Sequence, residues 1–530
     1  MGAEIEQKAP WRRTFAAWSD SRVIAMLFLG FSAGIPLLLI FSTLSVWLRE
    51  AGTGRSEVTF FSWAALGYSF KFIWAPLVDL MPLPFLTRRL GRRRAWLLLA
   101  QVLIMAAISG MALVDPAAHA GNLTTMACAA VLLGFSAATQ DIVIDAYRIE
   151  SVAPSMQAML ASMYIAGYRI GMLVAGAGAL LLASHLATNP GGYDYPAWRL
   201  TYLAMASVML VGVATTLRIR EPLVERKDLY TYLPAQYRRL FFLFVLSAAG
   251  FALTFFASGG WFQALQEYLR RQVPLLGHLA GFIVEVPRFF IAVVAALTIA
   301  RLGVATRFVD RKMVEVTYAA PVRDFFSRYR LRAALLVLAL VGFYRLSDVV
   351  LGVVANVFYL DMGYSKETIA YVSQTFGLAM TLLGGFFGGM LTLRFGINSI
   401  LLLGAFLSAI TNLLFMFLAG AGKDTAFLAM VIAADNLSAG LATTAFVAFL
   451  SSLTSVSFTA VQYAVFSSVM TLMPKLIGGY SGSLVTAFGY ESFFLMTAVM
   501  GIPVLGLIWL VRRAVVAVPR GVVNGDSGGS

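Results

Sequence analysis

Four polar side chains lie close together inside one long apolar stretch. Asp141, Asp145 and Arg148 are separated by four and three residues, so a helix would place them on one face, beside Gln140. Two carboxylates one turn apart could hold a single shared proton, because like charges at short range oppose the ionisation of both. The spacing therefore predicts that Asp141 and Asp145 couple this face to protons. The alternative is that Asp145 only pairs with Arg148 near the end of the helix.

A second set of polar side chains combines cations with aromatic rings. Arg169 lies beside Tyr164 and Tyr168, and Lys71 lies between two phenylalanines in another apolar stretch. A guanidinium among tyrosines suits a carboxylate or phosphate and the apolar side of a sugar ring. These four residues are therefore expected to bind a ligand. The alternative for Arg169 is a structural ion pair with a facing aspartate.

The second half of the chain carries a comparable polar stripe. Arg345, Asp348, Gly352 and Asn356 are spaced by three, four and four residues, so they share one helical face. Arg345 and Asp348 could simply neutralise each other, whereas Asn356 has no such partner and suggests a cavity wall. Further expected ligand-binding residues inside apolar stretches are Gln140, Gln374, Asp435, Asn436, Gln462 and Lys475. Asn412 is favoured instead as a contact between helices.

Long apolar blocks must position all of these residues. The chain has 530 residues, of which 60% are hydrophobic and 12% charged, and its mean hydropathy is +0.81. The blocks have the length that crosses a hydrocarbon core, about 20 residues, where helices are the default because lipid cannot pair with free backbone groups. We therefore predict an all-α membrane protein. The fourteen expected spans are 23–48, 58–80, 95–114, 122–147, 156–184, 198–218, 240–258, 279–300, 333–359, 368–391, 397–419, 425–450, 458–486 and 492–511.

The positive charge of the chain fits membrane topology better than nucleic-acid binding. The formal net charge is +14, but Lys and Arg occur in short clusters in alternate connections, without a single basic face. The positive-inside rule places these connections and both termini in the cytoplasm, and we expect the first span to be retained as an anchor. The amphipathic stretch from Trp261 to Gln272 is expected to lie along the membrane interface.

The residues that usually build metal sites and catalytic sites are scarce. Cys128 is the single cysteine and lies in an apolar block, so packing is its expected role, and the three histidines share no spacing. We find no nucleophile, base and acid at workable spacing and no phosphate-cradling glycine loop. We therefore expect no enzyme, no cofactor and no metal.

The two halves of the chain look related. Phe135 to Tyr147 and Leu437 to Phe449 lie 302 residues apart, share Ser and Ala in register, and both occupy the fourth span of a six-span unit. Two parallel six-span repeats are typical of the major facilitator fold. The expected parts are a cytoplasmic segment 1–22, a six-helix bundle 23–220, a central cytoplasmic connection with two extra membrane helices 221–332, a second six-helix bundle 333–513 and a disordered tail 514–530.

The fifth expected span carries small residues at a regular spacing. Gly167, Gly171, Ala175 and Ala179 recur every four residues, so they form one stripe on a helix. Small residues let two helix backbones approach closely in a membrane. The stripe therefore predicts a tight contact with another helix.

The connection after the second expected span resembles the acidic and basic signature of the major facilitators. Asp79 precedes a basic cluster that includes Arg92 and Arg93, and the second half has Arg394, with Leu393 at the place of the acid. In that signature an acidic helix end pairs with basic residues across the inner face. We therefore expect Asp79, Arg92, Arg93 and Arg394 to form a gate. The alternative is that the arginines only set the topology.

The chain resembles the muropeptide permeases of the AmpG type, in the peptide and acetyl-coenzyme A transporter family, over about 22–220 and 321–512. The residues that carry the resemblance are Phe70 to Asp79, Gln140 to Ala146, Gly167 to Met172 and Thr444 to Phe449. The resemblance implies proton-driven import of anhydromuropeptides (GlcNAc-anhydroMurNAc peptides) across a Gram-negative inner membrane for peptidoglycan recycling. It also implies a link to β-lactamase induction, because the imported fragments are the inducing signal.

Two other functions stay open at this stage. One is a carrier of acetyl-coenzyme A or another acyl group or glycopeptide. The other is a membrane receptor that binds a ligand in the same chamber without transporting it. The expected partners are a small glycopeptide, protons and the lipid bilayer, without nucleic acid, and we expect a monomer.

Overall fold

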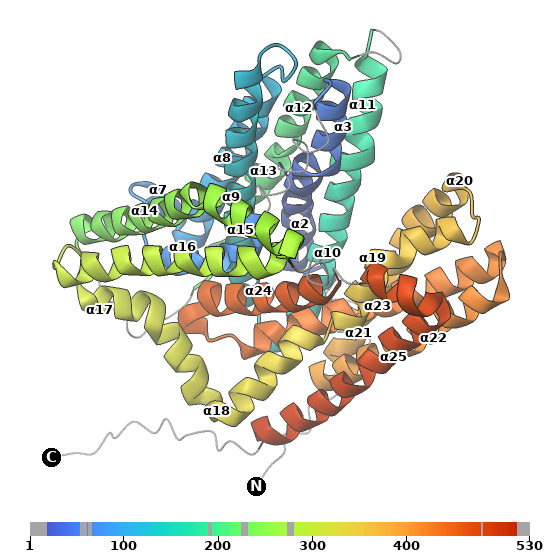
Figure 1. The fold of residues 1–530 in the computed structure, drawn as a ribbon. Coiled ribbons are helices and arrows are strands. Elements are labelled where there is room, and N and C mark those ends of the chain that lie inside the picture. The colour runs from blue at the N-terminus through green and yellow to red at the C-terminus, as the bar shows by residue number, and fades with distance from the viewer. Residues whose placement is uncertain are drawn as a thin grey trace, which may run out of the picture. The chain divides into compact units, whose positions relative to one another are not determined.

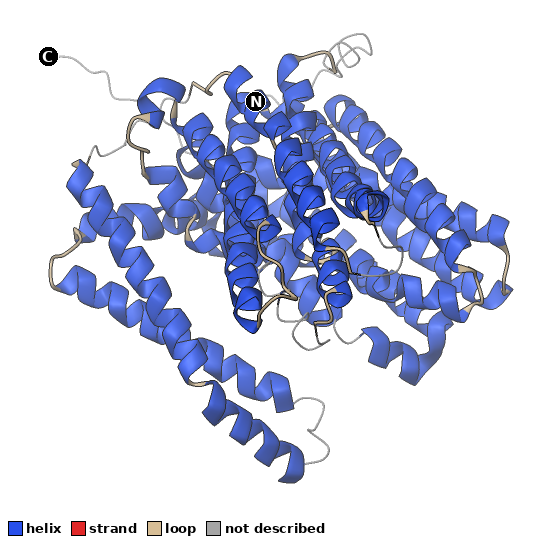
Figure 2. Cartoon of the chain, turned by 90° about the horizontal axis from the view of Figure 1, so that it is seen from above, coloured by secondary structure: helices blue, strands red, loops and turns tan. Residues whose placement is uncertain are grey.

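The computed structural model describes residues 18–53, 61, 66–188, 193–223, 232–272, 280–478 and 481–516. Every regular element among these residues is helical (Figures 1 and 2). The expected all-α fold class is therefore confirmed. Asp20 and Asp424 each start a helix by accepting hydrogen bonds from backbone N–H groups of its first turn, the usual role of an N-cap aspartate.

The first half of the chain runs from residue 21 to residue 218. Its helices are α2 (Ser21–Ile40), α3 (Ser42–Glu50), α5 (Leu66–Phe70), η2 (Lys71–Ile73), α6 (Ala75–Leu80), α7 (Leu86–Leu90), α8 (Arg92–Ala112), α9 (Ala120–Ser151), η3 (Pro154–Met156), α10 (Gln157–Leu173), η4 (Val174–Gly178), α11 (Ala179–Leu186), α12 (Tyr195–Val208) and α13 (Leu210–Arg218).

The central helices and the second half follow in the chain. The central helices are α14 (Pro234–Ala257), α15 (Gly259–Gln272), α16 (Ala280–Ala305), α17 (Arg311–Val314) and η6 (Glu315–Ala319). The second half contains α18 (Ala320–Phe343), α19 (Leu346–Asp361), α20 (Lys366–Ile369), η7 (Ala370–Phe376), α21 (Gly377–Phe395), α22 (Ile397–Ala421), α23 (Thr425–Leu453), η8 (Val456–Phe458), α24 (Thr459–Gly478) and α25 (Ser481–Val516).

Twelve described segments are long and apolar enough to cross a membrane. They correspond to twelve of the fourteen expected spans. The other two expected spans differ from each other: 58–80 contains the short helices α5, η2 and α6, whereas 458–486 contains the 20-residue helix α24 and the start of α25. α15 is the helix that covers the amphipathic stretch.

Two compact units make up the chain. Met1–Glu225 and Phe325–Ser530 form the first unit, which contains both halves, and Arg226–Asp324 form the second. Inside the first unit, one apolar core fills the first half and includes Trp47, Trp198 and Tyr202. Another core joins the halves, because Ile149 of α9 packs with residues of α18, α23 and α24.

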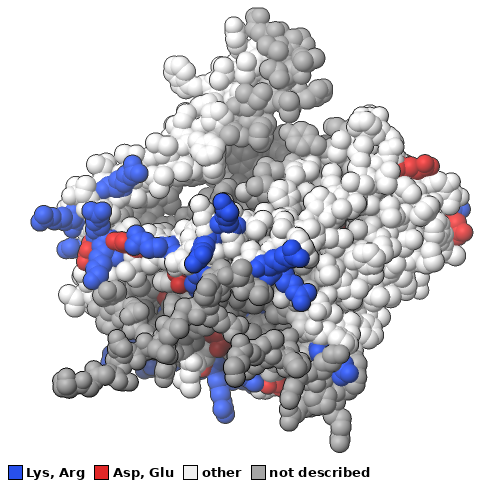
Figure 3. Space-filling model, turned by 90° about the horizontal axis from the view of Figure 1, so that it is seen from below, with Lys and Arg blue, Asp and Glu red and all other residues white. Residues whose placement is uncertain are grey.

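Lys and Arg concentrate at one end of the helices of the first unit. This end, which we call the basic end, is where α2 begins, α8 begins and α9 ends, and it carries Arg22, Arg92, Arg93 and Arg94. Figure 3 shows more Lys and Arg than Asp and Glu on the face that it draws.

Cys128 differs from its expected role. The side chain is free and exposed, on a helix whose opposite face packs in the core. An apolar block does not by itself reveal which face of its helix is buried, so packing was the wrong expectation for Cys128.

The predicted small-residue contact is confirmed and joins α10 to α2. A Cβ atom on Gly167 would lie 1.9 Å from the carbonyl oxygen of Leu27, and one on Gly171 would lie 2.2 Å from that of Phe31. The partner helix α2 also has a glycine at this contact, because a Cβ atom on Gly30 would lie 2.1 Å from the carbonyl oxygen of Tyr164. This contact holds the helix that carries Tyr164 and Tyr168 against α2.

We predict that Gly167→Ala destabilises the protein, because the added methyl must push two backbones apart, at a cost of about 1–3 kcal/mol. Gly178→Ala is the matched control, since its new Cβ would have no neighbour closer than 3.8 Å. Thermal unfolding in detergent should show a lower midpoint for Gly167→Ala alone. Equal midpoints for the two variants would contradict the close approach.

Candidate functional site

A chain of ion pairs links three charged residues in the first half. Lys71 Nζ lies 3.6 Å from Asp145 Oδ2, and Arg148 Nη2 lies 3.3 Å from Asp145 Oδ1. Lys71 begins the short helix η2, at the break between α5 and α6, whereas Asp145 and Arg148 lie on the long helix α9. All three side chains are almost fully buried, so each charge depends on the others for compensation.

Asp141 occupies the next turn of α9 and faces α10. The hydroxyl of Tyr164 donates a hydrogen bond of 3.2 Å to Asp141 Oδ1, and the rings of Tyr164 and Tyr168 lie 6.0 Å apart. Gln140 is fully buried, and its amide nitrogen lies 3.5 Å from the hydroxyl of Ser32 on α2. The structure therefore brings Asp141, Asp145, Tyr164 and Lys71 together, while the amide nitrogen of Gln140 points to α2.

Arg148 connects the first half to the second. Its Nη1 donates to Ser451 Oγ of α23 at 2.7 Å and to Gln157 Oε1 at 3.2 Å, and its guanidinium lies 5.1 Å from the centre of the Tyr463 ring of α24. The ion pair between Asp145 and Arg148 that we considered as an alternative is present. Asp145 forms this ion pair in addition to its ion pair with Lys71. Asp145 therefore links the buried amine of Lys71 to Arg148, which contacts the second half.

The second half has its own polar cluster. Arg345 Nε lies 3.4 Å from Asp348 Oδ2, so these two charges do neutralise each other. Each also binds a hydroxyl group of a neighbouring helix, Arg345 that of Thr443 on α23 and Asp348 that of Ser408 on α22. The cluster therefore ties the start of α19 to two other helices.

Asp435 and Asn436 extend this polar cluster along α23. Thr411 on α22 donates to Asp435 Oδ1 at 3.2 Å, and Thr381 on α21 donates to Asn436 Oδ1 at 2.8 Å. Asn412 is 1% exposed, and its amide has no hydrogen-bond partner among the described residues. The polar cluster of the second half thus reaches α21 as well as α19.

The remaining candidate residues lie outside these contacts. Arg169, Asn356 and Gln374 are exposed side chains on α10, α19 and η7. Gln462 is buried near the start of α24, where it accepts hydrogen bonds from Arg328 and from the backbone N–H of Ser455, both 2.8 Å long. The Lys475 side chain lies outside the described residues.

The expected gate residues Asp79 and Arg93 form a buried network at the basic end. Arg93 Nη2 lies 2.7 Å from Asp79 Oδ1 and 2.5 Å from Glu150 Oε1. Arg92 donates to the backbone oxygen of Asp79 at 2.6 Å. The guanidinium of Arg394, the expected gate residue of the second half, lies 5.6 Å from the ring centre of Phe395.

Asp79 also binds the first turn of a helix in the opposite half. The backbone N–H groups of Ala460 and Val461, in the first turn of α24, donate to Asp79 Oδ2 at 3.0 and 3.2 Å. A carboxylate satisfies the free N–H groups of a helix start and interacts favourably with the helix dipole. Asp79 therefore holds the two halves together at the basic end, together with Arg148.

A third contact between the halves lies nearby. Cβ atoms added to Gly385 and Gly389 of α21 would lie 3.6 and 3.3 Å from Ser162 of α10. The contacts of Asp79, Arg148 and Ser162 all join the halves toward the basic end. They describe a state in which the halves are closed on this side.

Several residues of the site were not anticipated from the sequence. Glu150 pairs with Arg93, and Glu221 accepts hydrogen bonds from the backbone N–H groups of Arg93 and Arg94, at the start of α8. A glutamate at the end of an apolar block gives no signal of its partner. Among the described residues, no group of His, Cys, Asp and Glu could hold a metal ion.

Comparison with known proteins connects this arrangement to transporters. The family model described as acetyl-coenzyme A transporter 1 matches residues 23–190. The chain is 29% identical to the putative transporter AmpG 4 of Rickettsia conorii, over 94% of this chain and 98% of the relative. It is 27% identical to the anhydromuropeptide permease of Escherichia coli K12, over 94% of this chain and 81% of the relative.

Solved structures of major facilitators share the fold. The proton:xylose symporter XylE aligns with a TM-score of 0.55 at 15% identity, covering 94% of this chain and 96% of XylE. The transporter FucP in its outward conformation aligns with a TM-score of 0.61 at 11% identity, covering 93% and 99%. The predicted major facilitator fold and the resemblance to AmpG-type permeases are therefore confirmed.

The comparisons correct the expected extent of the resemblance. We expected it to cover 22–220 and 321–512 and to leave out the central stretch. A match over 94% of the chain cannot omit the residues between these ranges.

We predict that Asp79→Asn weakens closure at the basic end, because the neutral side chain loses its ion pair with Arg93. Removing one partner of a buried pair costs up to about 3–5 kcal/mol, and less here because Glu150 still binds Arg93. Closure is measured with the substitution Ser162→Cys in a Cys128→Ser background, because Ser162 of α10 is buried against α21. This cysteine should react about tenfold faster with a thiol reagent when Asp79→Asn is also present than when Asp79 is retained.

Asp20→Asn is the control for this experiment, since Asp20 forms an ion pair with Arg22 that is largely exposed and carries little energy. An unchanged labelling rate in Asp79→Asn would show that the carboxylate does not hold the halves together.

Proposed function

We propose that this chain, a homologue of the AmpG-type permeases with the major facilitator fold, imports anhydromuropeptides across the bacterial inner membrane, driven by protons. Its similarity to the Escherichia coli anhydromuropeptide permease, along 94% of the chain, supports this substrate class. A carrier of such fragments serves peptidoglycan recycling and supplies the signal for β-lactamase induction. The relatives are transporters, which favours transport over catalysis.

The observation that carries the proposal is the pair of charged clusters in the two halves. Lys71, Asp141 and Asp145 lie in the first half, and Arg345 and Asp348 in the second, all within largely apolar stretches of the chain. Charges at this depth are costly, by about 2.5–3.5 kcal/mol each on insertion scales, unless they line an aqueous path or pair with one another. Two such clusters suit a ligand that carries charge and touches both halves.

The proposed ligand matches the chemistry of the candidate binding residues. A muropeptide carries carboxylates on its peptide and apolar faces on its sugars. Arg169 and Arg345 would bind carboxylates, while Tyr164 and Tyr168 would pack against a sugar ring. Lys71, Gln140, Asp348, Asn356, Gln374, Asp435, Asn436, Gln462 and Lys475 complete the proposed binding set.

The contacts that close the basic end support a proposal for the side from which the substrate enters. By the positive-inside rule we propose that the basic end and both termini face the cytoplasm. Contacts of Asp79, Arg92, Arg93 and Arg148 would then seal the cytoplasmic side, so the substrate would enter from the periplasm. Rocking of one half against the other would break these contacts and release it inside. Arg394 remains a proposed gate residue of the second half.

The geometry suggests how a proton could act on this seal. Asp145 binds Lys71 on one side and Arg148 on the other, and Arg148 binds Ser451 in the second half. A proton on Asp145 would remove the negative charge that holds both cations. Arg148 would then lose its compensation, and the contact between the halves would weaken. Asp141, one turn away and bound to Tyr164, is the proposed entry point of the proton.

The domain organisation is part of the same proposal. The two bundles at 23–220 and 333–513 would form the transport path of a monomer, with the segment 1–22 and the tail 514–530 outside it. The central connection 221–332 would add two membrane helices.

One observation favours a second substrate class. The family model that matches residues 23–190 is described as an acetyl-coenzyme A transporter. A coenzyme A thioester is also anionic and amphipathic, so it would use the same arginines. Uptake of radiolabelled muropeptide into proteoliposomes, with and without a proton gradient, tests the leading proposal. Competition by coenzyme A would point to the second class, and binding without accumulation would point to a receptor.

We predict that Asp141→Asn or Asp145→Asn abolishes uptake driven by a proton gradient while leaving exchange of labelled for unlabelled substrate intact. The amide cannot take up a proton at these positions, whereas exchange needs no net proton movement. Asp194→Asn is the control, because Asp194 caps α12 outside the membrane spans and asparagine also caps helices. Gradient-driven uptake with unchanged pH dependence in the Asp141 and Asp145 variants would rule out their coupling role.

A further inference from the structure

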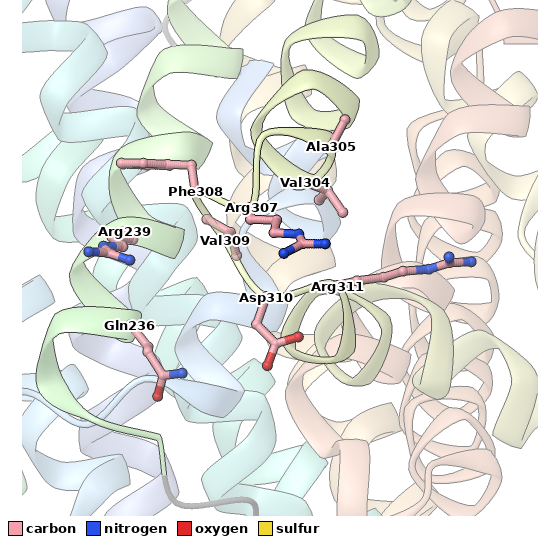
Figure 4. Close-up of a pocket in the computed structure, with 9 residues that line it drawn as sticks. All are labelled: Gln236, Arg239, Val304, Ala305, Arg307, Phe308, Val309, Asp310 and Arg311. Atoms are coloured by element: carbon pink, nitrogen blue, oxygen red, sulfur yellow. The ribbon is translucent and has the colours of Figure 1, made fainter.

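The central unit contains a polar cavity of its own. The cavity has a volume of about 680 Å³ and lies where α14 begins and α16 ends. Figure 4 shows the nine residues that line it: Gln236, Arg239, Val304, Ala305, Arg307, Phe308, Val309, Asp310 and Arg311. All of them belong to the second compact unit, so the cavity does not depend on the transport path.

Three arginines give the cavity its chemical character. Arg239 comes from α14, Arg307 from the turn after α16, and Arg311 from the start of α17 (Figure 4). All three are exposed. No carboxylate among the described residues lies within ion-pair distance of these three guanidinium groups, although the Arg239 guanidinium lies 5.9 Å from the ring centre of Phe308. Planar guanidinium groups are well suited to bind phosphate oxygens.

The acidic residue of the cavity is already engaged. Asp310 Oδ1 accepts a hydrogen bond of 2.9 Å from the backbone N–H of Lys312, so its carboxylate caps α17. This leaves an excess of positive charge in the cavity, since Asp310 is the single acid among its nine lining residues.

Arg307 lies in a hydrogen-bonded turn and has an unusual backbone conformation. Arg307 has a φ of +58°, in the left-handed region that residues other than glycine seldom adopt. Its backbone N–H donates to the carbonyl oxygen of Val304, and the N–H of Val309 donates to that of Gly303. The turn therefore supplies hydrogen-bond donors to carbonyl groups at the end of α16. A strained arginine at the mouth of a polar cavity is consistent with selection for its side chain.

The helices beside the cavity are built to face lipid. In the membrane-spanning windows of both α14 and α16, only 11% of residues are buried. Large apolar side chains are exposed along them, including Phe242, Leu253 and Val294. Phe242 and Phe308 also form an edge-to-face contact with a centroid distance of 6.2 Å at the level of the cavity. Exposed apolar side chains therefore continue from the cavity along both helices.

We propose that this cavity binds the phosphate headgroup of an anionic phospholipid, whose acyl chains lie along α14 and α16. The arginines supply the charge and hydrogen bonds for the phosphate, and the exposed apolar side chains contact the acyl chains. A basic pocket between membrane helices at the membrane surface is a known way of recognising acidic lipids. A free phosphate would use the same arginines but would gain nothing from the apolar surface.

The test uses the full chain purified in detergent and mixed with phosphatidylglycerol or phosphatidylcholine, with bound lipid counted by native mass spectrometry. Arg239→Gln and Arg307→Gly remove two guanidinium groups, and glycine accepts the positive φ at residue 307 without strain. Arg301→Gln is the matched control, since Arg301 is exposed in the same unit but does not line the cavity. Thermal unfolding checks that each variant remains folded.

The wild-type chain should retain phosphatidylglycerol in preference to phosphatidylcholine. Each cavity variant should lose about fivefold in affinity for phosphatidylglycerol, as expected for one basic residue near an anionic lipid surface, and Arg301→Gln should retain it. Equal binding by the cavity variants and the wild type, or an equal loss in Arg301→Gln, would overturn the site. Displacement of the lipid by inorganic phosphate at an equal concentration would overturn the lipid assignment.

Discussion

The structure depends on compensating charges that lie inside apolar helices. Lys71 and Arg148 share the single carboxylate of Asp145, so the trio keeps one net positive charge. Arg148 finds its further partners, Ser451 and the Tyr463 ring, across the boundary between the halves. The compensation of a buried charge in the first half is therefore completed by the second half. Any change in the charge of Asp145 must act on the contact between them.

The two halves compensate their buried charges in different ways. In the second half, Arg345 and Asp348 neutralise each other and bind hydroxyl groups within the same half. The contact of Asp79 at the basic end is also one-sided. Asp79 of the first half binds the start of α24, whereas Leu393, at the corresponding place in the second half, is apolar and cannot bind a helix start. The two halves share the fold, while the charged side chains that form these hydrogen bonds across the boundary, Asp79 and Arg148, belong to the first half.

Local spacing predicted the parts of the site that lie on one helix. The three- and four-residue spacing of Asp141, Asp145 and Arg148 placed them correctly on one face of α9, and the glycine stripe correctly predicted a close contact with another helix, although not which one. Contacts between distant residues left no such pattern. Ser451 is 303 residues from Arg148 and Glu150 is 57 residues from Arg93, so no periodicity connects them. The helical type and twelve of the fourteen expected spans were predictable, because bilayer thickness and backbone pairing leave few alternatives.

The central claim is that the polar residues line a water-filled chamber. Single cysteines at Arg169, Asn356 and Leu181, a 71% exposed residue of the apolar helix α11 that we expect to face lipid, test it with a charged, membrane-impermeant thiol reagent in a Cys128→Ser background. The proposed mechanism predicts rapid reaction of Arg169→Cys and Asn356→Cys from the side opposite the basic end, and no reaction of Leu181→Cys. If Arg169→Cys and Asn356→Cys are as unreactive as Leu181→Cys, these residues face lipid or dry protein, and the transport mechanism is contradicted.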